Sequence, residues 1–270
     1  MTSSDQPVEN LALVLAFMRQ SVGQDILFLP EVINCLSLDP VHQAQVLEYF
    51  DNNFFIDAVC KEACSLSLWV ALGSIALKTN DPDGRHANQS ILIDANGAVV
   101  AQYDKIHMFD VTVSEVERYH ESKGYRPGDA AVLARTPWGG VGLSICYDLR
   151  FPALYRALAH AGAGILAVPS AFAQSTGEAH WHVLLRARAI ETGCFVIAAA
   201  QTGVHSGSGR KTYGHSLIVD PWGQVILDAG RLPGLHFVEL DLTDVDKVRS
   251  RMASLSHDRH FKVRYHTNHD

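Results

Sequence analysis

The sequence predicts an α/β fold that is built on a mixed β-sheet, or on two sheets with helices on their outer faces. Strand-like and helix-like segments alternate in the middle of the chain, and β-hairpins flank that region. No internal repeat, low-complexity tract or linker rich in Pro, Gly and Ser divides the 270 residues. We therefore expect a single domain over residues 1–270.

The composition limits the class of protein. Hydrophobic residues make up 47% of the chain and charged residues 19%, which is enough apolar material for a sizeable core. A formal net charge of −7 argues against a nucleic-acid binder, and no apolar run approaches the roughly 20 residues that a membrane span needs. The N-terminus lacks the features of a secretory signal, and the five cysteines form no metal-type pairs, so we expect a cytoplasmic protein with reduced thiols.

Apolar spacing and turn residues predict the elements of the first half of the chain. The pair Asn96-Gly97 separates two β-rich runs, and a tight hairpin turn favours this pair because both positions need a positive φ. In chain order, we predict a helix over residues 8–23, a strand over 25–31, a helix over 41–64, a strand over 68–77 and a hairpin over 89–105.

Glycines mark several boundaries in the second half. Gly139-Gly140 suggests a second hairpin turn, and Gly193 ends a helical pattern as its left-handed cap. In chain order, we predict a hairpin over residues 136–148, a helix over 152–164, a strand over 165–172, a helix over 180–193, a strand over 194–201, a hairpin over 216–228 and a strand over 235–242.

Three residues that can do chemistry end or closely follow a β-type run, namely Glu31, Lys105 and Cys146. Strand ends are rigid and lie beside loops, where clefts form. A thiol needs a base, and Glu31 can serve as one. A carbonyl under attack needs a cation or N–H donors for its oxygen, which the Lys105 ammonium and the Tyr147 backbone N–H can supply.

Each of these residues also has an ordinary structural interpretation. A single cysteine after a buried strand is usually a small core residue, and glutamates and lysines near loops are usually solvated. The 14 histidines invite a metal or Cys–His interpretation, but His180 and His182 stand at i and i+2 and do not face together on a helix. The H-E-x-x-H, paired C-x-x-C and G-x-G-x-x-G patterns are absent, and GSGRKT at 207–212 lacks the spacing of a phosphate loop.

A series of segments resembles the nitrilase (carbon–nitrogen hydrolase) superfamily, in the order in which that family has them. The segments are FLPE at 28–31, YDKIHMFD at 103–110, ESKGYRPGD at 121–129, GLSICYDLRFP at 142–152, PSAF at 169–172, TGEAHWHVLLRARAIET at 176–192, AAAQTG at 198–203 and YGHSLIVDPWG at 213–223. The resemblance implies a four-layer α-β-β-α sandwich that pairs into a homodimer and needs no metal or cofactor.

The resemblance also implies roles for particular residues. The family's catalytic triad falls on Glu31, Lys105 and Cys146, and its supporting glutamate falls on Glu121. The finer matches resemble the Nit branch, whose members hydrolyse deaminated glutathione. In that branch, the positions that contact the α-keto carboxylate end of the substrate correspond to Arg150, Phe172 and Thr176.

Two departures from the family pattern raise expectations of their own. The family's first strand, of the type V-A-x-x-Q, is not found before the segment that begins at Met1, so we expect the sandwich to lack this strand. The family's HWE appears as HWH, with His182 at the glutamate position, and we expect this residue to change the polarity of the pocket without removing the triad.

The residues and the resemblance together predict a cysteine-dependent amidase that acts on a small, carboxylate-bearing amide with water and passes through a thioester. Four alternatives remain at this point. They are an ω-amidase acting on α-keto acid amides, an N-carbamoyl amino acid hydrolase, a catalytically silent binding protein of the same fold, and a Cys–His enzyme that pairs Cys146 with a histidine such as His215.

Overall fold

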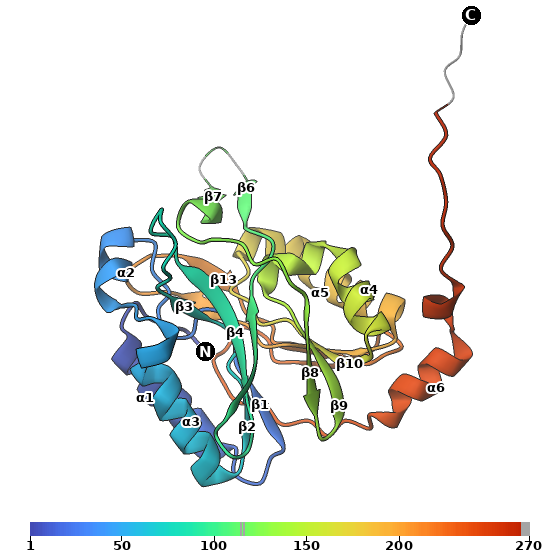
Figure 1. Cartoon of the computed structure of the whole chain (residues 1–270), viewed down its shortest axis with the longest axis horizontal. Helices are drawn as coiled ribbons and strands as arrows, with labels where there is room; N and C mark the ends of the chain where they lie inside the picture. Colours follow the sequence, from blue (N-terminus) through green and yellow to red (C-terminus); the bar gives the residue numbers. More distant parts are fainter. Residues whose placement is uncertain (114, 116, 266–270) are drawn as a thin grey trace, which may run out of the picture.

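The computed structural model describes residues 1–113, 115 and 117–265, and its elements are stacked in layers (Figure 1). The first sheet is mixed, with β1 parallel to β2 and the other pairs antiparallel. In order across the sheet, its strands are β1 (Ile26–Phe28), β2 (Trp69–Ala71), β4 (Ala87–Ile93) and β3 (Ile75–Leu77), with β5 (Val99–Asp104) also paired to β4.

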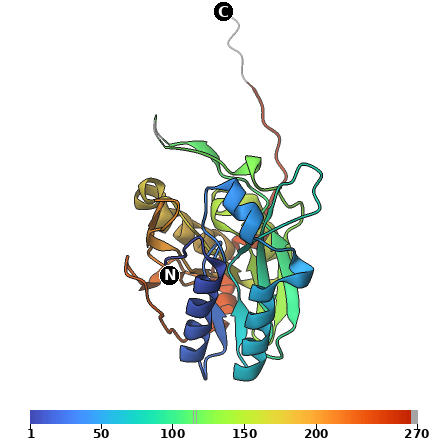
Figure 2. The same cartoon turned by 90° about the vertical axis from the view of Figure 1, so that its left-hand side faces the viewer.

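Two helices cover the outer face of this sheet, α1 (Pro7–Gln20) and α3 (Phe54–Leu66), and they run side by side in Figure 2. Each presents an apolar stripe to the sheet. Val14 of α1, Val59 of α3 and Ile91 of β4 are fully buried in one hydrophobic cluster. Burial of this stripe is the main force that holds the two helices on the sheet.

The second sheet contains the alternating part of the chain. Its parallel strands β9, β10 and β11 are connected by α4 (Pro152–His160) and α5 (Gln174–Thr192), which pack on one face of the sheet. In order, its strands are β15 (Val225–Asp228), β14 (Leu217–Val219), β11 (Phe195–Ala198), β10 (Ala163–Ala167), β9 (Gly139–Leu143) and β8 (Val132–Thr136).

Apolar side chains lie where the two sheets meet. Ala71 and Leu92 of the first sheet form a buried cluster with Ala134 of the second sheet. With helices outside both sheets, this contact confirms the predicted four-layer α-β-β-α sandwich. The other described elements are α2 (Pro40–Val46), β6 (Asp110–Thr112), β7 (Arg118–His120), β12 (Thr202–Val204), β13 (Lys211–Tyr213), α6 (Thr243–Arg251), and the 3₁₀ turns η1 (Phe50–Asn52), η2 (Glu121–Lys123), η3 (Cys146–Arg150) and η4 (Ser254–His257).

Two predicted elements are interrupted. The helix predicted over residues 41–64 is divided into α2, η1 and α3, because the Asn53 side chain accepts hydrogen bonds from the amides of Phe55 and Ile56 and so caps a new helix. The strand predicted over 68–77 is divided into β2 and β3. The break lies at Gly73, whose φ is +60° and where a Cβ would collide with the Pro30 carbonyl oxygen.

The three predicted hairpins are present as β4–β5, β8–β9 and β14–β15. The turn of the second one is displaced from the predicted Gly139-Gly140. Thr136 pairs with Gly139, so Pro137 and Trp138 form the turn and both glycines belong to β9. The helix stop at Gly193 is confirmed by its φ of +59°.

The strand predicted over residues 235–242 is wrong, since this segment pairs with no strand in the described part of the chain. A strand needs a neighbour for its backbone groups. Instead, the segment lines a cavity of about 650 Å³ whose other wall includes the edge of β1. Among the described residues no strand precedes β1, and none of their helices is long and apolar enough to cross a membrane.

Candidate active site

The carboxyl ends of strands from both sheets meet at one end of the sandwich. Glu31 follows β1, Cys146 follows β9, and Lys105 follows β5. The Cys146 amide donates to the Pro169 carbonyl beyond β10 at 2.9 Å, which ties the two strand ends together. The three residues that were singled out from sequence are therefore brought together.

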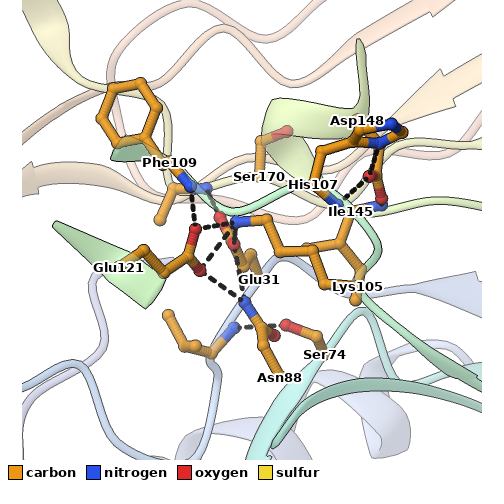
Figure 3. A network of polar contacts seen from close by, with 12 residues as sticks. Glu31, Ser74, Asn88, Lys105, His107, Phe109, Glu121, Ile145, Asp148 and Ser170 are labelled. Carbon is orange, nitrogen blue, oxygen red and sulfur yellow. Dashed lines mark hydrogen bonds and ion pairs between the residues drawn. The ribbon is translucent and has the colours of Figure 1, made fainter. Parts of the chain in front are cut away.

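Lys105 lies between two carboxylates (Figure 3). Its Nζ is 2.9 Å from Glu31 Oε1, and 2.8 Å and 2.9 Å from the two oxygens of Glu121. Only 2% of the Lys105 side chain is exposed. A buried ammonium is stable in the core only when its donors are satisfied, and here all three N–H groups have acceptors.

Further donors fix both carboxylates. Asn88 Nδ2 donates to Glu31 Oε1 at 2.9 Å, and the Phe109 amide donates to Glu121 Oε2 at 2.6 Å. The second oxygen of Glu31 accepts from the Ala171 amide at 2.7 Å. The network in Figure 3 therefore leaves each carboxylate little freedom to move.

The charges of this network settle its protonation. Burial raises the pKa of Glu31, but the Lys105 ammonium outweighs burial and leaves that pKa below its ordinary value. Burial lowers the pKa of Lys105, but Glu121 and Glu31 raise it well above its ordinary value. Burial and the Glu31 carboxylate raise the pKa of Cys146. The resting site thus holds a thiol beside a carboxylate base and an ammonium.

Cys146 occupies a strained backbone position, with a φ of +47°, where β9 turns into η3. The Asp148 carboxylate holds this turn. Its oxygens accept from the amides of Ile145 and His107, from the His107 ring, and from the Tyr103 hydroxyl. The sharp turn places the thiol at the floor of a cavity.

The cavity has a volume of about 420 Å³, a size suited to a small ligand. Glu31, Lys105, Glu121 and Cys146 lie in its wall, as do Tyr147, Phe172 and Thr176. Arg150 is not part of this wall. Its Nη2 is 3.2 Å from His180 Nδ1, and its guanidinium lies over the Tyr147 and Phe172 rings.

His182 and His215 lie outside the wall of this cavity. Both bind Asp228, with His182 Nε2 at 3.0 Å and His215 Nδ1 at 2.8 Å, and the three side chains are close enough to one another to hold a metal ion. The expectation that His182 changes the polarity of the pocket is therefore wrong, because its ring is directed to Asp228. The placement of His215 also gives no support to a Cys–His pair.

Sequence reasoning missed three residues of the site. Asn88 bridges Glu31 and Glu121, Asp148 holds the Cys146 turn, and Arg210 lies in the cavity wall. Asn88 lies inside a strand and carried no signal. Arg210 belongs to the GSGRKT stretch, whose spacing does not fit a phosphate loop and gives no separate signal for the arginine. The only available signal for Asp148 was its place two residues after the cysteine.

Comparisons with known proteins show what the whole chain is similar to. A sequence profile described as "Carbon-nitrogen hydrolase" matches residues 5–250. A Dictyostelium discoideum protein named deaminated glutathione amidase is 41% identical over 266 residues, which are 95% of this chain and 91% of that protein. The human protein of the same name is 38% identical over 264 residues, 96% of this chain and 80% of that one.

Solved structures show the same fold. The Caenorhabditis elegans NitFhit protein superposes with a TM-score of 0.88 at 36% identity, covering 96% of this chain and 63% of that chain. This chain thus spans less than two thirds of the NitFhit protein. Saccharomyces cerevisiae Nit3, described as a member of branch 10 of the nitrilase superfamily, gives a TM-score of 0.82 at 25% identity, covering 93% of this chain and 91% of that one.

Proposed function

Because this chain belongs to the carbon–nitrogen hydrolase family and is a hydrolase of carbon–nitrogen bonds other than peptide bonds, we propose that it cleaves a small, carboxylate-bearing amide through a thioester on Cys146. The first candidate substrate is deaminated glutathione, the compound in the name of the relatives at 38–44% identity. The observation that carries the proposal is the meeting of Glu31, Lys105 and Cys146 at the cavity floor.

The first half of the reaction forms the thioester. Glu31 takes the proton from Cys146 as the sulfur attacks the amide carbon, and this protonation releases the Lys105 N–H that Glu31 accepts in the resting site. The released Lys105 N–H and the Tyr147 N–H stabilise the negative oxygen that forms. The carbon–nitrogen bond then breaks, and Glu31 passes its proton to the leaving nitrogen. The low pKa of Glu31 and the raised pKa of Cys146 mean that this proton moves only as the carbonyl is attacked.

The second half regenerates the enzyme. Water loses a proton to Glu31 and attacks the thioester, after which the carbon–sulfur bond breaks and the proton returns to the thiolate. Glu121 holds Lys105 in place throughout, through its two bonds to the ammonium. With deaminated glutathione, the products are α-ketoglutarate and cysteinylglycine.

The test is a substrate panel with the wild-type chain and the Cys146→Ala variant. We expect equal amounts of α-ketoglutarate and cysteinylglycine from deaminated glutathione, and no product from the variant. The panel includes α-ketoglutaramate, which an ω-amidase would prefer, and N-carbamoyl amino acids. Intact mass spectrometry after rapid quenching should find the acyl group on Cys146. Full activity of Cys146→Ala would exclude the mechanism, and no turnover of any amide would favour a silent binding protein.

The proposal includes a homodimer in the cytoplasm. Val183 and Ile190 stand seven residues apart on α5 with 68% and 51% of their surfaces exposed, as expected of a helix face that a second copy covers. Beyond η4 the chain leaves the body as an extended segment with Phe261 exposed (Figure 1). Light scattering after size exclusion tests the dimer, and the variant Val183→Lys should shift it toward monomer.

All five cysteines are free thiols, in keeping with a reducing compartment.

A further inference from the structure

Arg210 is a cation in the cavity wall whose charge no described carboxylate neutralises by an ion pair. Its Nη2 donates to the Ala171 carbonyl at 2.6 Å. Its Nε is buried and has no hydrogen-bond partner among the residues that the structure describes. Because this Nε is closed off from solvent, the ligand-accessible part of the guanidinium is its terminal N–H groups, which belong to a residue of the cavity wall.

The guanidinium is held in position before any ligand arrives. It lies 5.4 Å over the ring of Tyr119, which belongs to the β6–β7 hairpin, and the Ala171 carbonyl holds its other side. Arg210 itself precedes β13, and its carbonyl accepts from the His205 amide at 2.9 Å. A guanidinium fixed in this way can grip a carboxylate with little loss of side-chain freedom.

Ala171 shows which part of a substrate Arg210 faces. The Ala171 amide donates to Glu31 Oε2 at 2.7 Å, while its carbonyl accepts from Arg210. Glu31 gives its proton to the leaving nitrogen, so Arg210 stands on the side of the leaving group. The Arg118 and Lys123 side chains line the same cavity and add positive charge to it.

We propose that Arg210 binds a carboxylate in the leaving half of the substrate and so sets the preference for amides of acidic amines. This inference rests on the proposed function. In deaminated glutathione the leaving group is cysteinylglycine, whose glycine carboxylate is the anion that Arg210 takes. α-Ketoglutaramate, which loses ammonia, offers no such group.

The experiment compares deaminated glutathione with its glycine amide, in which the same leaving group is neutral. We expect wild type to prefer the acid in kcat/KM by about 10- to 100-fold, the range of a hydrogen bond to a charged group. In Arg210→Met this acid-to-amide ratio should approach one, and in Arg210→Lys it should be intermediate. The acid and the amide carry the same acyl group. A variant that changes the general reactivity of the enzyme therefore changes both kcat/KM values alike and leaves their ratio unchanged.

Arg19→Met is the matched control, because it removes the same charge from α1, which contributes no residue to the cavity wall and on which the Arg19 Nε donates to Glu62. Its acid-to-amide ratio should equal that of wild type. If Arg210→Met fails to fold by circular dichroism, the Arg210→Lys ratio and calorimetric binding of the acid and the amide to Cys146→Ala decide the question. In Cys146→Ala, which keeps Arg210, the acid should bind about 10- to 100-fold more tightly.

The outcomes separate the two proposals. An unchanged ratio in Arg210→Met, or equal rates for acid and amide in wild type, overturns the role of Arg210 and leaves the amidase intact. A wild-type chain that hydrolyses no amide of the panel overturns the proposed function, and the assignment of Arg210 falls with it.

Discussion

The Tyr103 hydroxyl donates a 2.7 Å hydrogen bond to the carboxylate of Asp148, a contact that joins β5 of the first sheet to the turn that carries Cys146. Tyr103 lies two residues before Lys105 in the sequence, and Asp148 lies two residues after Cys146. Both side chains are almost fully buried, at 1% and 0% exposure. The pair therefore fixes the distance between the ammonium and the thiol across the two sheets.

Removal of this contact should lower stability and rate together. Tyr103→Phe keeps the ring but loses a hydrogen bond to a charged acceptor, and we expect a loss of about 1.5–3 kcal/mol in the free energy of unfolding. Asp148→Asn should also lower kcat by up to about 100-fold, because a shift of the thiol by a fraction of an ångström spoils the attack geometry. Urea unfolding and steady-state kinetics measure both effects.

Tyr155→Phe is the control for this pair. The Tyr155 hydroxyl is bonded to Ser144 Oγ at 2.8 Å in the same core but does not bind Asp148. The variant Tyr155→Phe should therefore lower the free energy of unfolding and leave kcat little changed. An equal fall of kcat in Tyr103→Phe and Tyr155→Phe would show that stability, and not the position of Cys146, decides the rate.

Lys105→Met should destabilise the chain in a pH-dependent way. The variant leaves Glu31 and Glu121 close together without their shared cation, and breaking a buried ion pair from one side costs about 3–5 kcal/mol. Without the ammonium, burial raises the pKa of Glu31 in the folded variant above its value in the unfolded chain. The unfolded chain then loses this proton first as the pH rises, so the free energy of unfolding falls with increasing pH. Urea unfolding at acidic and neutral pH checks this.

The matched control is Lys61→Met, which removes an exposed lysine from α3. It should change the free energy of unfolding little at any pH. If Lys105→Met were as stable as Lys61→Met at neutral pH, the two carboxylates would not depend on Lys105.

Glu31, Lys105 and Cys146 stand out in the sequence because each comes at or near a strand end, a local feature, but only the order of the family's segments along the chain favours a catalytic role over an ordinary structural one. Asn88 could not be predicted, since it lies inside β4 and its role depends on the two glutamates that meet it in space. Arg210 could not be predicted either, because it lies in a loop and its guanidinium is held by Ala171 and Tyr119, which are distant in the sequence.

The fold was predictable to a similar depth. Hairpins and helix periods are local, and most of them are present. The strand predicted over residues 235–242 has the right composition, but a strand forms only beside another strand, and a cavity separates this segment from β1. The helix boundary at Asn53 was not predicted, because this residue stands in an apolar helical pattern and only the hydrogen bonds of its side chain to the Phe55 and Ile56 amides show that a new helix begins there.

The pH dependence of kcat/KM should be broad and flat. The reaction needs Glu31 ionised and Lys105 protonated, and the pKa of Glu31 is lowered while that of Lys105 is raised. We therefore expect constant kcat/KM from about pH 5.5 to 8, with the acid limb below the ordinary pKa of a glutamate. A limb near pH 6.5 would instead indicate a histidine base.

The same shift affects stability. Because the folded pKa of Glu31 is depressed, its stabilising contribution is present above the unfolded pKa and is lost as the pH falls through the folded value. Glu31→Gln should flatten the acid side of the stability profile in urea unfolding. An unchanged acid dependence in Glu31→Gln would mean that other carboxylates determine it.

Gly73→Ala should disturb Glu31 from a neighbouring loop. Gly73 has a φ of +60°, and a Cβ there would collide with the backbone oxygens of Leu29 and Pro30, immediately before Glu31. The next residue, Ser74, holds the same loop through its bonds to Val32 and Ile33. A shift of Pro30 therefore moves the proposed base directly, and we expect kcat to fall by at least about 10-fold besides a loss of stability.

The control separates the collision from backbone strain. Gly84 has a similar φ of +74°, but a Cβ there would meet nothing within 4 Å. Gly84→Ala should therefore lose only about 1 kcal/mol of unfolding free energy, with kcat unchanged. If kcat also stayed at the wild-type value in Gly73→Ala, the loop before Glu31 would not determine the position of the base. A fall in Gly73→Ala alone would show that the close approach of β2–β3 to Pro30 positions the carboxylate for catalysis.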